Sequence, residues 1–191
     1  MEELEKVLKL INAPILNILN DGIDIKVKNE VFPSNYICDD LETLYKWKNG
    51  TNLLNIQLIG NAWLIYMGSF ISFDRAQTIY QSRAGEDKYW SSSMFPIFES
   101  LGGEFHLIEC NMENIEFGSI YYHSIGDIDF ETIIKRYDSL ESLFNTVTEC
   151  YVSQIHTFDE KGLLITNLEK AIQIGKKNNP QSGFWNLFDD N

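Results

Sequence analysis

The feature that most constrains the fold is a series of three short β-like segments in the middle of the chain. The segments are MFPIFES (94–100), EFHLIECN (104–111) and GSIYYHSI (118–125), and the turn signals Leu-Gly-Gly and Glu-Phe-Gly separate them. Connections this short join neighbouring antiparallel strands, whereas parallel strands need a crossover of a dozen or more residues. We therefore predict an antiparallel meander at the centre of the molecule.

Helical patterns precede the meander. Residues 2–19 carry apolar side chains at helical spacing, and Pro14 should end or kink that helix. Residues 41–49 predict a second helix, capped at Asp39 or Asp40, with Gly50 as its stop.

A hairpin and a third helix are predicted next. Residues 55–70 are apolar or alternating around the Gly-Asn pair at 60–61, which is typical of two strands joined by a tight turn. Residues 73–84 then show helical spacing, and Ser72 or Asp74 can cap that helix. This helix should cover one face of the sheet.

From Phe130 the pattern becomes helical again, and a long helix is predicted after the meander. Asp138 is a credible N-cap, with Glu141 three residues later as a capping box requires. A last helix within 162–180 ends in two lysines, Asn and Pro, and a polar-aromatic tail closes the chain. The pattern as a whole predicts an α+β fold: a central, mainly antiparallel sheet with helices packed on it.

The charge balance limits the class of partner. Lys and Arg number 15 against 28 Asp and Glu, which gives a formal net charge of −13. Phosphate backbones and anionic lipid surfaces would be repelled, so we expect no nucleic-acid and no membrane partner. The acidity either only keeps the protein well solvated or complements a basic partner.

The cysteines and the N-terminal segment bear on the compartment. Cys38, Cys110 and Cys150 contain no CxxC pair, so we interpret them as reduced core residues. The first residues are acidic where a signal peptide needs positive charge, and no segment approaches 18 uninterrupted apolar residues. We expect a cytoplasmic protein.

Candidate catalytic or metal-ligating side chains are few. The chain has no P-loop, GxGxxG, GxSxG, HExxH or EF-hand pattern. His106 and His123 lie on adjacent predicted strands, where a cross-strand metal or acid-base site with Glu104, Glu109 or Asp127 is conceivable. The alternating pattern around each histidine instead favours a structural role in a strand, and we expect no metal.

A nucleophile is the other chemical possibility. Cys110 and His106 are separated by an even number of positions on one predicted strand, which puts their side chains on the same face. A reactive thiolate also needs an activating environment, which a sequence does not reveal, so we assign no catalytic residue.

Acidic residues flank the third strand of the meander and are expected on loops. Such residues either form a solvated surface or, on a rigid sheet, make a docking patch for a cationic partner. We take four of them as the candidate partner-binding site: Glu113, Glu116, Asp127 and Asp129.

Four segments, in their order and spacing, resemble the SUKH superfamily, which includes bacterial toxin-immunity proteins and a fungal cell-wall-assembly regulator linked to glucan synthesis. The segments are LYKWKNG (44–50), FPIF (95–98), GGEFHLIEC (102–110) and GSIYYH (118–123). The similarity covers roughly residues 35–150. Glu104 departs from the usual pattern, where many members have Asp or a short polar residue.

This resemblance implies a non-catalytic protein without a cofactor that binds a protein partner. We expect residues 1–191 to form a single SUKH-like domain, in which 155–191 are a C-terminal helical extension. The first functional hypothesis is an immunity protein that neutralises a basic toxin domain by direct binding, which a charge of −13 would suit. The alternatives are an intracellular regulator or scaffold of cell-wall or glucan synthesis, and, last, an enzyme with a His/carboxylate site. Oligomeric state is left open.

Overall fold

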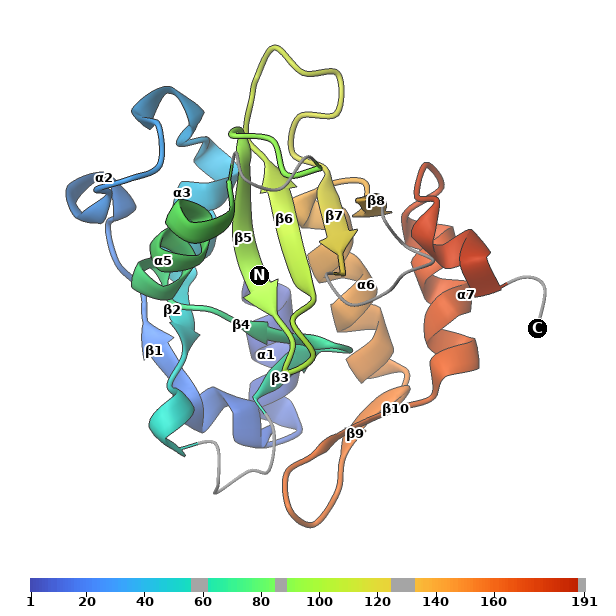
Figure 1. Cartoon of the computed structure of the whole chain (residues 1–191). Helices are drawn as coiled ribbons and strands as arrows, with labels where there is room; N and C mark the ends of the chain where they lie inside the picture. The colour runs from blue at the N-terminus through green and yellow to red at the C-terminus, as the bar shows by residue number, and fades with distance from the viewer. Residues whose placement is uncertain (56–61, 85–88, 125–132, 189–191) are drawn as a thin grey trace.

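The centre of the molecule is a six-stranded antiparallel sheet (Figure 1), seen in a computed structural model that describes residues 1–55, 62–84, 89–124 and 133–188. The strands follow one another in space in the order in which they occur in the chain. They are β3 (Trp63–Ile65), β4 (Gly68–Phe70), β5 (Met94–Glu99), β6 (Phe105–Glu109), β7 (Ile120–His123) and β8 (Ile134–Tyr137). The predicted α+β class with a central antiparallel meander is confirmed.

Strands β5, β6 and β7 are the three predicted meander strands. His106 pairs with Tyr122 and Phe105 with His123 across β6 and β7. All five residues of β6 are buried, so this strand runs through the middle of the core. Short turns and alternating apolar residues are local signals, which explains why the sequence identified these strands.

Strand β8 is a correction to the helix predicted from Phe130 onward. Residues 134–137 pair with β7, with Tyr122 opposite Ile134 and Ile120 opposite Tyr137. The side chains of the segment IKRY do not alternate between buried apolar and exposed polar, since the two neighbouring buried residues are Arg136 and Tyr137. An arginine in the core is a tertiary arrangement that no periodicity predicts.

The predicted hairpin in residues 55–70 is only partly described. Its expected turn at 60–61 lies outside the described residues. Residues 62–70, expected as one strand, instead fold back at Tyr66 and Met67 to form β3 and β4. Met67 has a φ of 62°, the left-handed conformation that such tight turns require.

The helices surround the sheet (Figure 1). The α-helices in the described residues are α1 (Glu2–Leu10), α2 (Ile25–Lys28), α3 (Asp39–Trp47), α5 (Phe73–Arg83), α6 (Leu140–Val152) and α7 (Leu168–Asn178). Short 3-10 helices are η1 (Pro14–Ile18), η2 (Ser34–Tyr36), η3 (Leu53–Asn55) and η4 (Phe184–Phe188). As predicted, the first helix ends before Pro14, which begins η1.

Gly50 does not stop helix α3, which already ends at Trp47. It lies in strand β2 (Lys48–Thr51), which pairs with β1 (Leu19–Asp21). Gly50 has a φ of 72°, and a Cβ added there would lie 2.1 Å from the backbone nitrogen of Ser72. Glycine is therefore required for a close approach of two backbones.

The helix caps are local signals, and one was predicted correctly. Ser72 caps α5, with its side chain accepting a hydrogen bond from the backbone nitrogen of Arg75. For α6 the cap is Ser139, one residue after the predicted Asp138. Ser139 and Ser142 exchange side chain to backbone hydrogen bonds of 3.0 and 2.9 Å as a capping box.

The core contains a chain of aromatic rings that links the helices to the sheet. Phe73 on α5 lies 5.1 Å from Tyr45 on α3 and 5.4 Å from Phe95 on β5, centroid to centroid. Trp47 packs edge-to-face on Phe144 at 5.5 Å and so fixes α3 against α6. These two helices position the site described below.

The C-terminal segment begins with a hairpin, β9 (His156–Phe158) and β10 (Leu164–Thr166), before α7 and η4. It packs on the sheet through η4. Trp185 donates from Nε1 to the carbonyl oxygen of Arg136 at 2.7 Å, and the Phe184 ring lies 4.5 Å from the guanidinium carbon of Arg136. The aromatic tail therefore contacts β8 directly.

Candidate functional site

The loop between β6 and β7 (residues 110–119, the β6–β7 loop) carries two of the four predicted partner-binding acids. It projects beyond one end of the sheet (Figure 1), and Glu113 is exposed on it whereas Glu116 is partly buried. Asp127 and Asp129 lie outside the described residues. The loop is thus the part of the predicted surface whose geometry is described.

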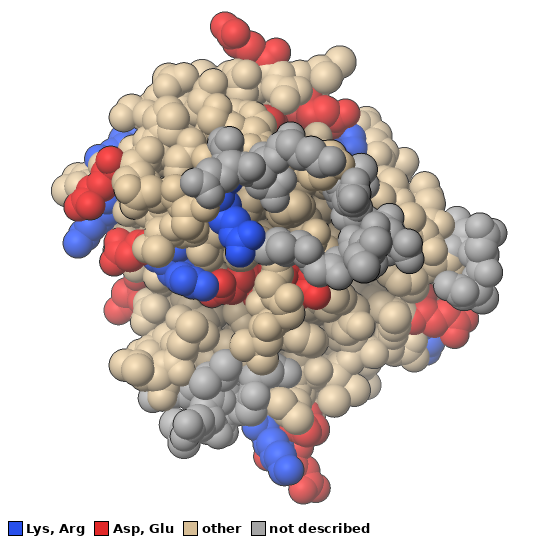
Figure 2. All heavy atoms as spheres, in the orientation of Figure 1, with Lys and Arg blue, Asp and Glu red and all other residues tan. Residues whose placement is uncertain are grey.

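Glu116 has a role inside the loop. Its Oε2 accepts hydrogen bonds from Lys135 Nζ at 2.6 Å and from Ser119 Oγ at 3.1 Å. Lys135 is the main cause that lowers the pKa of Glu116 below its usual value. Among the contacts of the described residues, Glu113 has no comparable ion pair. Figure 2 shows acidic side chains projecting at the top of the molecule, where Figure 1 places this loop. Of the two acids, Glu113 is the one available to a partner.

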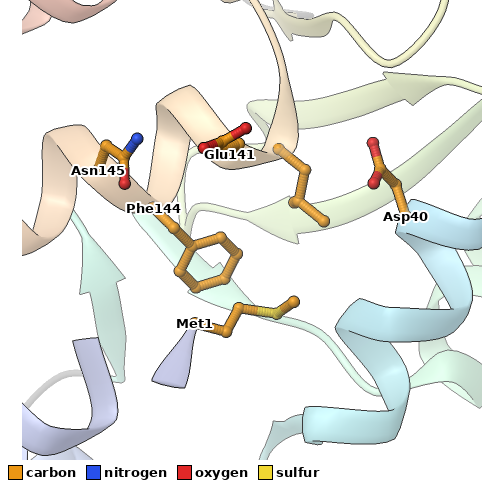
Figure 3. A pocket seen from close by; sticks show the side chains of 6 residues that line it. Met1, Asp40, Glu141, Phe144 and Asn145 are labelled. Carbon is orange, nitrogen blue, oxygen red and sulfur yellow. The ribbon is translucent and has the colours of Figure 1, made fainter. Parts of the chain in front are cut away.

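An acidic hollow lies where α3 and α6 begin. Its volume is about 220 Å³. Figure 3 shows Asp40 on α3 and Glu141 on α6 at two sides of this hollow, with Phe144 and Met1 between the helices. The full set of lining residues is Met1, Asp40, Leu140, Glu141, Phe144 and Asn145.

The electrostatics of this hollow favour a cation. Burial, followed by the nearby carboxylates of Asp39 and Glu141, raises the pKa of Asp40 above its usual value. None of the lining residues in the described part of the chain is a lysine or arginine, and the cationic group among them is the α-ammonium of Met1, which interacts with Glu141. Acids in the first turn also stabilise a helix dipole, so each has a structural use. Together they form a half-open acidic site that a basic side chain would neutralise.

The hollow and the β6–β7 loop adjoin at Gly118. A Cβ added to Gly118 would lie 3.5 Å from Oδ2 of Asp40, in ordinary contact. The end of the β6–β7 loop therefore lies next to the acidic hollow. Sequence reasoning did not find the hollow, because Asp40 and Glu141 lie far apart in the chain and each was interpreted only as a helix cap signal. No local pattern links them.

The conceivable cross-strand site is not assembled from the residues that the structure describes. His106 is fully buried and its Nε2 accepts a hydrogen bond from Arg136. Glu109 instead binds the β6–β7 loop, accepting from the backbone nitrogen of Asn111 at 2.8 Å. The carboxylate of Glu104 lies over the β5–β6 turn beside Gly102. These three side chains have different partners, and Asp127 lies outside the described residues.

The conceivable His-Cys pair is also separated. Cys110 Sγ lies 3.7 Å from Cys38 Sγ, and both thiols are buried. Burial is the main cause that raises the pKa of Cys110 well above its usual value. Cys110 is therefore a protonated core thiol beside Cys38, and His106 contacts Arg136 instead.

The described residues hold neither a metal-binding cluster nor a membrane-spanning helix. No three His, Cys, Asp or Glu side chains there are grouped so that they could hold a metal ion. Of the helices in those ranges, none combines the length and the apolar character needed to span a membrane.

A known protein family matches the part of the chain that contains these residues. The model of the SMI1/KNR4 family (SUKH-1) matches residues 30–146, which is more than half of the chain. The match includes α3, the meander, the β6–β7 loop and the beginning of α6, so both acids of the hollow lie inside it. A comparison with curated proteins found no match.

Proposed function

The chain belongs to the SMI1/KNR4 family (SUKH-1), and from this premise we propose that it is an immunity protein that neutralises a basic toxin domain by binding it. The proposal places the contact on the surface formed by the acidic hollow and the β6–β7 loop. Neutralisation then needs no chemistry by this chain, because a tightly bound protein blocks the toxin's own site.

One observation carries the proposal: Asp40 and Glu141 line a hollow of about 220 Å³ whose lining has no lysine or arginine and whose one cationic group is the α-ammonium of Met1, beside Glu141. A lysine or arginine side chain of the partner carries the charge that these two carboxylates would bind. The acids at the edge of the hollow would replace the water around that cation with charge-assisted hydrogen bonds. Binding would also relieve the repulsion that, together with burial, raises the pKa of Asp40.

The net charge supports the same partner. A molecule with a formal charge of −13 attracts a basic domain over a distance, which raises the association rate at low ionic strength. Long-range attraction is screened beyond a Debye length of about 8 Å at physiological ionic strength. The association rate should therefore fall markedly as salt is added.

The neighbouring gene separates this function from its alternative. An immunity gene should lie beside a large toxin gene with a variable C-terminal domain. A regulator or scaffold of cell-wall or glucan synthesis would have no such neighbour. Where the neighbour exists, its C-terminal domain is the partner to purify for the binding experiment.

Association and dissociation rates with that purified domain test the site. We expect the Glu113→Lys/Glu141→Lys double variant to lower the association rate about tenfold at low salt, because both acids are exposed on the proposed surface. Glu116 is left unchanged, since reversing it would place a cation against Lys135. The matched control is Glu160→Lys/Glu169→Lys, which changes the net charge equally at exposed positions on the β9–β10 turn and on α7.

A complex whose association rate responds equally to both double variants would show that only net charge matters. In that case the hollow is not the contact site. A rate unchanged by salt and by either variant would mean that the acidic surface is only solubilising. Absence of any complex with the toxin domain would contradict the immunity function itself.

A further inference from the structure

The β6–β7 loop exposes apolar side chains as well as acids. Ile115 is 98% exposed and Met112 is 72% exposed, and Phe117 is exposed to 39%. Single exposed apolar residues are common, but three within six positions on a projecting loop form a cluster that water solvates poorly. Such a cluster is typical of a surface that another molecule covers.

The loop is held in one shape by a buried carboxylate at its base. Glu109 is 1% exposed, and its two oxygens accept from the backbone nitrogen of Asn111 at 2.8 Å and from Nδ2 of Asn114 at 3.1 Å. The backbone nitrogen of Gly118 donates to the Glu109 carbonyl oxygen at 2.9 Å and closes the loop. One residue thus binds both arms of the loop.

Two asparagine side chains fix the segment between these anchors. Oδ1 of Asn111 accepts from the backbone nitrogen of Glu113 at 3.0 Å, and Oδ1 of Asn114 accepts from that of Glu116 at 3.0 Å. Lys135 then holds Glu116 from strand β8. A loop constrained in this way loses little conformational entropy when a partner binds, so more of the contact energy appears as affinity.

We propose that Met112, Ile115 and Phe117 are a preformed apolar anchor that enters an apolar pocket, bordered by lysine or arginine, on the protein partner. This inference rests on the proposed function and specifies how the partner is recognised. Aromatic and long apolar side chains that fill a pocket supply most of the binding energy of many interfaces, while charges at the rim mainly set the association rate. The anchor should therefore govern how slowly the complex dissociates.

Charge complementarity identifies a basic protein as the occupant. Glu113 lies between Met112 and Ile115 in the sequence, and Gly118, at the end of the same loop, lies next to Asp40 at the edge of the hollow. Anionic membrane surfaces would be repelled by these acids. A second copy of this chain would bring the same acids against each other. A protein partner with an apolar pocket and basic residues around it would complement both the apolar cluster and the acidic residues.

The experiment uses the full chain and the purified toxin domain encoded by the neighbouring gene. We expect Ile115→Ser and Met112→Ser each to raise the dissociation rate about tenfold, with the association rate changed by less than about twofold. The matched control is Leu101→Ser, an 89% exposed apolar residue on the turn at the opposite end of β5 and β6. It should leave both rates unchanged, and none of the three variants should alter the melting temperature.

Glu109→Gln tests the preformed shape without changing the contacting side chains. Glutamine replaces one accepting oxygen with a donor, so one of the two bonds to the loop is lost. We expect faster hydrogen exchange at residues 111–117 and affinity weakened by about three- to tenfold, because the loop must then be ordered on binding. An affinity equal to that of the unmodified chain, despite faster exchange, would contradict the role of Glu109 as a positioning residue.

The outcomes separate this proposal from the proposed function. If the toxin domain binds and the Ile115 and Met112 variants dissociate at the unmodified rate, the anchor proposal is wrong and the immunity function stands. If no domain binds the unmodified chain, both are wrong. Loop-dependent sedimentation with vesicles of 3:1 phosphatidylcholine and phosphatidylglycerol, or loop-dependent dimerisation in analytical ultracentrifugation, with domain binding unaffected, would also overturn the anchor proposal.

Discussion

Arg136 donates a 2.5 Å hydrogen bond from Nη1 to Nε2 of His106, so two buried side chains join β8 to β6 across β7. Arg136 also donates from Nη2 to the carbonyl oxygen of Tyr66 at 3.1 Å. Burial, followed by the charge of Arg136, holds the pKa of His106 well below its usual value. The imidazole is therefore neutral and can accept this bond, which makes His106 a structural residue.

Replacing His106 should destabilise the fold. In His106→Ala the buried guanidinium loses an acceptor, and we expect the free energy of unfolding to fall by about 2–4 kcal/mol. Chemical denaturation measures this loss. The double variant His106→Ala/Arg136→Met should lose less than the sum of the single variants, because the unpaired charge is gone. An unchanged free energy of unfolding with selective loss of partner binding would contradict this structural role.

Stability should decrease in mild acid because buried histidines stay neutral in the folded protein. Burial, followed by Arg136, lowers the pKa of His156 to about 4, and the pKa of His106 is also lowered. In the unfolded chain both would titrate near the usual value of about 6.5. Below that pH the unfolded state binds more protons than the folded state, so the free energy of unfolding falls as the pH falls.

The pH window and its size can be measured by urea unfolding between pH 7 and pH 4. For His156 the loss is spread from about pH 6.5 to about pH 4, with a slope of up to about 1.4 kcal/mol per pH unit. His156→Gln should have a shallower slope than the unmodified chain, since Gln does not titrate. Equal slopes in both proteins would show that His156 does not contribute to the acid sensitivity.

Gly175→Ala should destabilise the C-terminal segment although alanine favours helices. A Cβ added at Gly175 would lie 2.4 Å from Cδ2 of Trp185, and Trp185 is held by its bond to the Arg136 carbonyl oxygen. We expect a loss of about 1–3 kcal/mol in thermal or urea unfolding. Gln173→Ala, an exposed change on the same helix, is the control and should stay within about 0.5 kcal/mol of the unmodified chain.

Combining Gly175→Ala with Trp185→Ala gives a sharper test of this contact. Removing the indole relieves the clash, so the alanine at 175 should then cost little or be slightly favourable. If Gly175→Ala is equally costly with and without the indole, the close packing of α7 on η4 is not its cause.

Ser139→Ala should weaken helix α6 by loss of its cap. Ser139 accepts from the backbone nitrogen of Ser142 at 3.0 Å, and its loss is expected to reduce the free energy of unfolding by about 1 kcal/mol. Asn145→Ala on the exposed side of the same helix should have a smaller effect. A larger loss for Asn145→Ala than for Ser139→Ala would contradict this assignment of the cap.

The sequence by itself determined those elements whose signals are local. The turns around Leu101 to Gly103 and before Gly118 separate β5, β6 and β7 as predicted, and Ser72 caps α5 as predicted. Short turns, caps and side-chain alternation depend on a few consecutive residues, so they are visible before the chain folds. The order of these elements was also enough to predict the family.

Only the tertiary structure decided the features that depend on distant residues. Strand β8 exists because Arg136 finds His106, Tyr66 and the rings of η4, none of which is near it in the chain. Asp40 and Glu141 became a single hollow because the packing of Trp47 on Phe144 brings α3 and α6 together. Taken alone, Arg136 is simply a basic residue in a strand, and Asp40 and Glu141 are acidic residues in the first turn of a helix. The members of each pair act together only because packing of the core brings them close in space. Their separation in the sequence gives no sign of this contact.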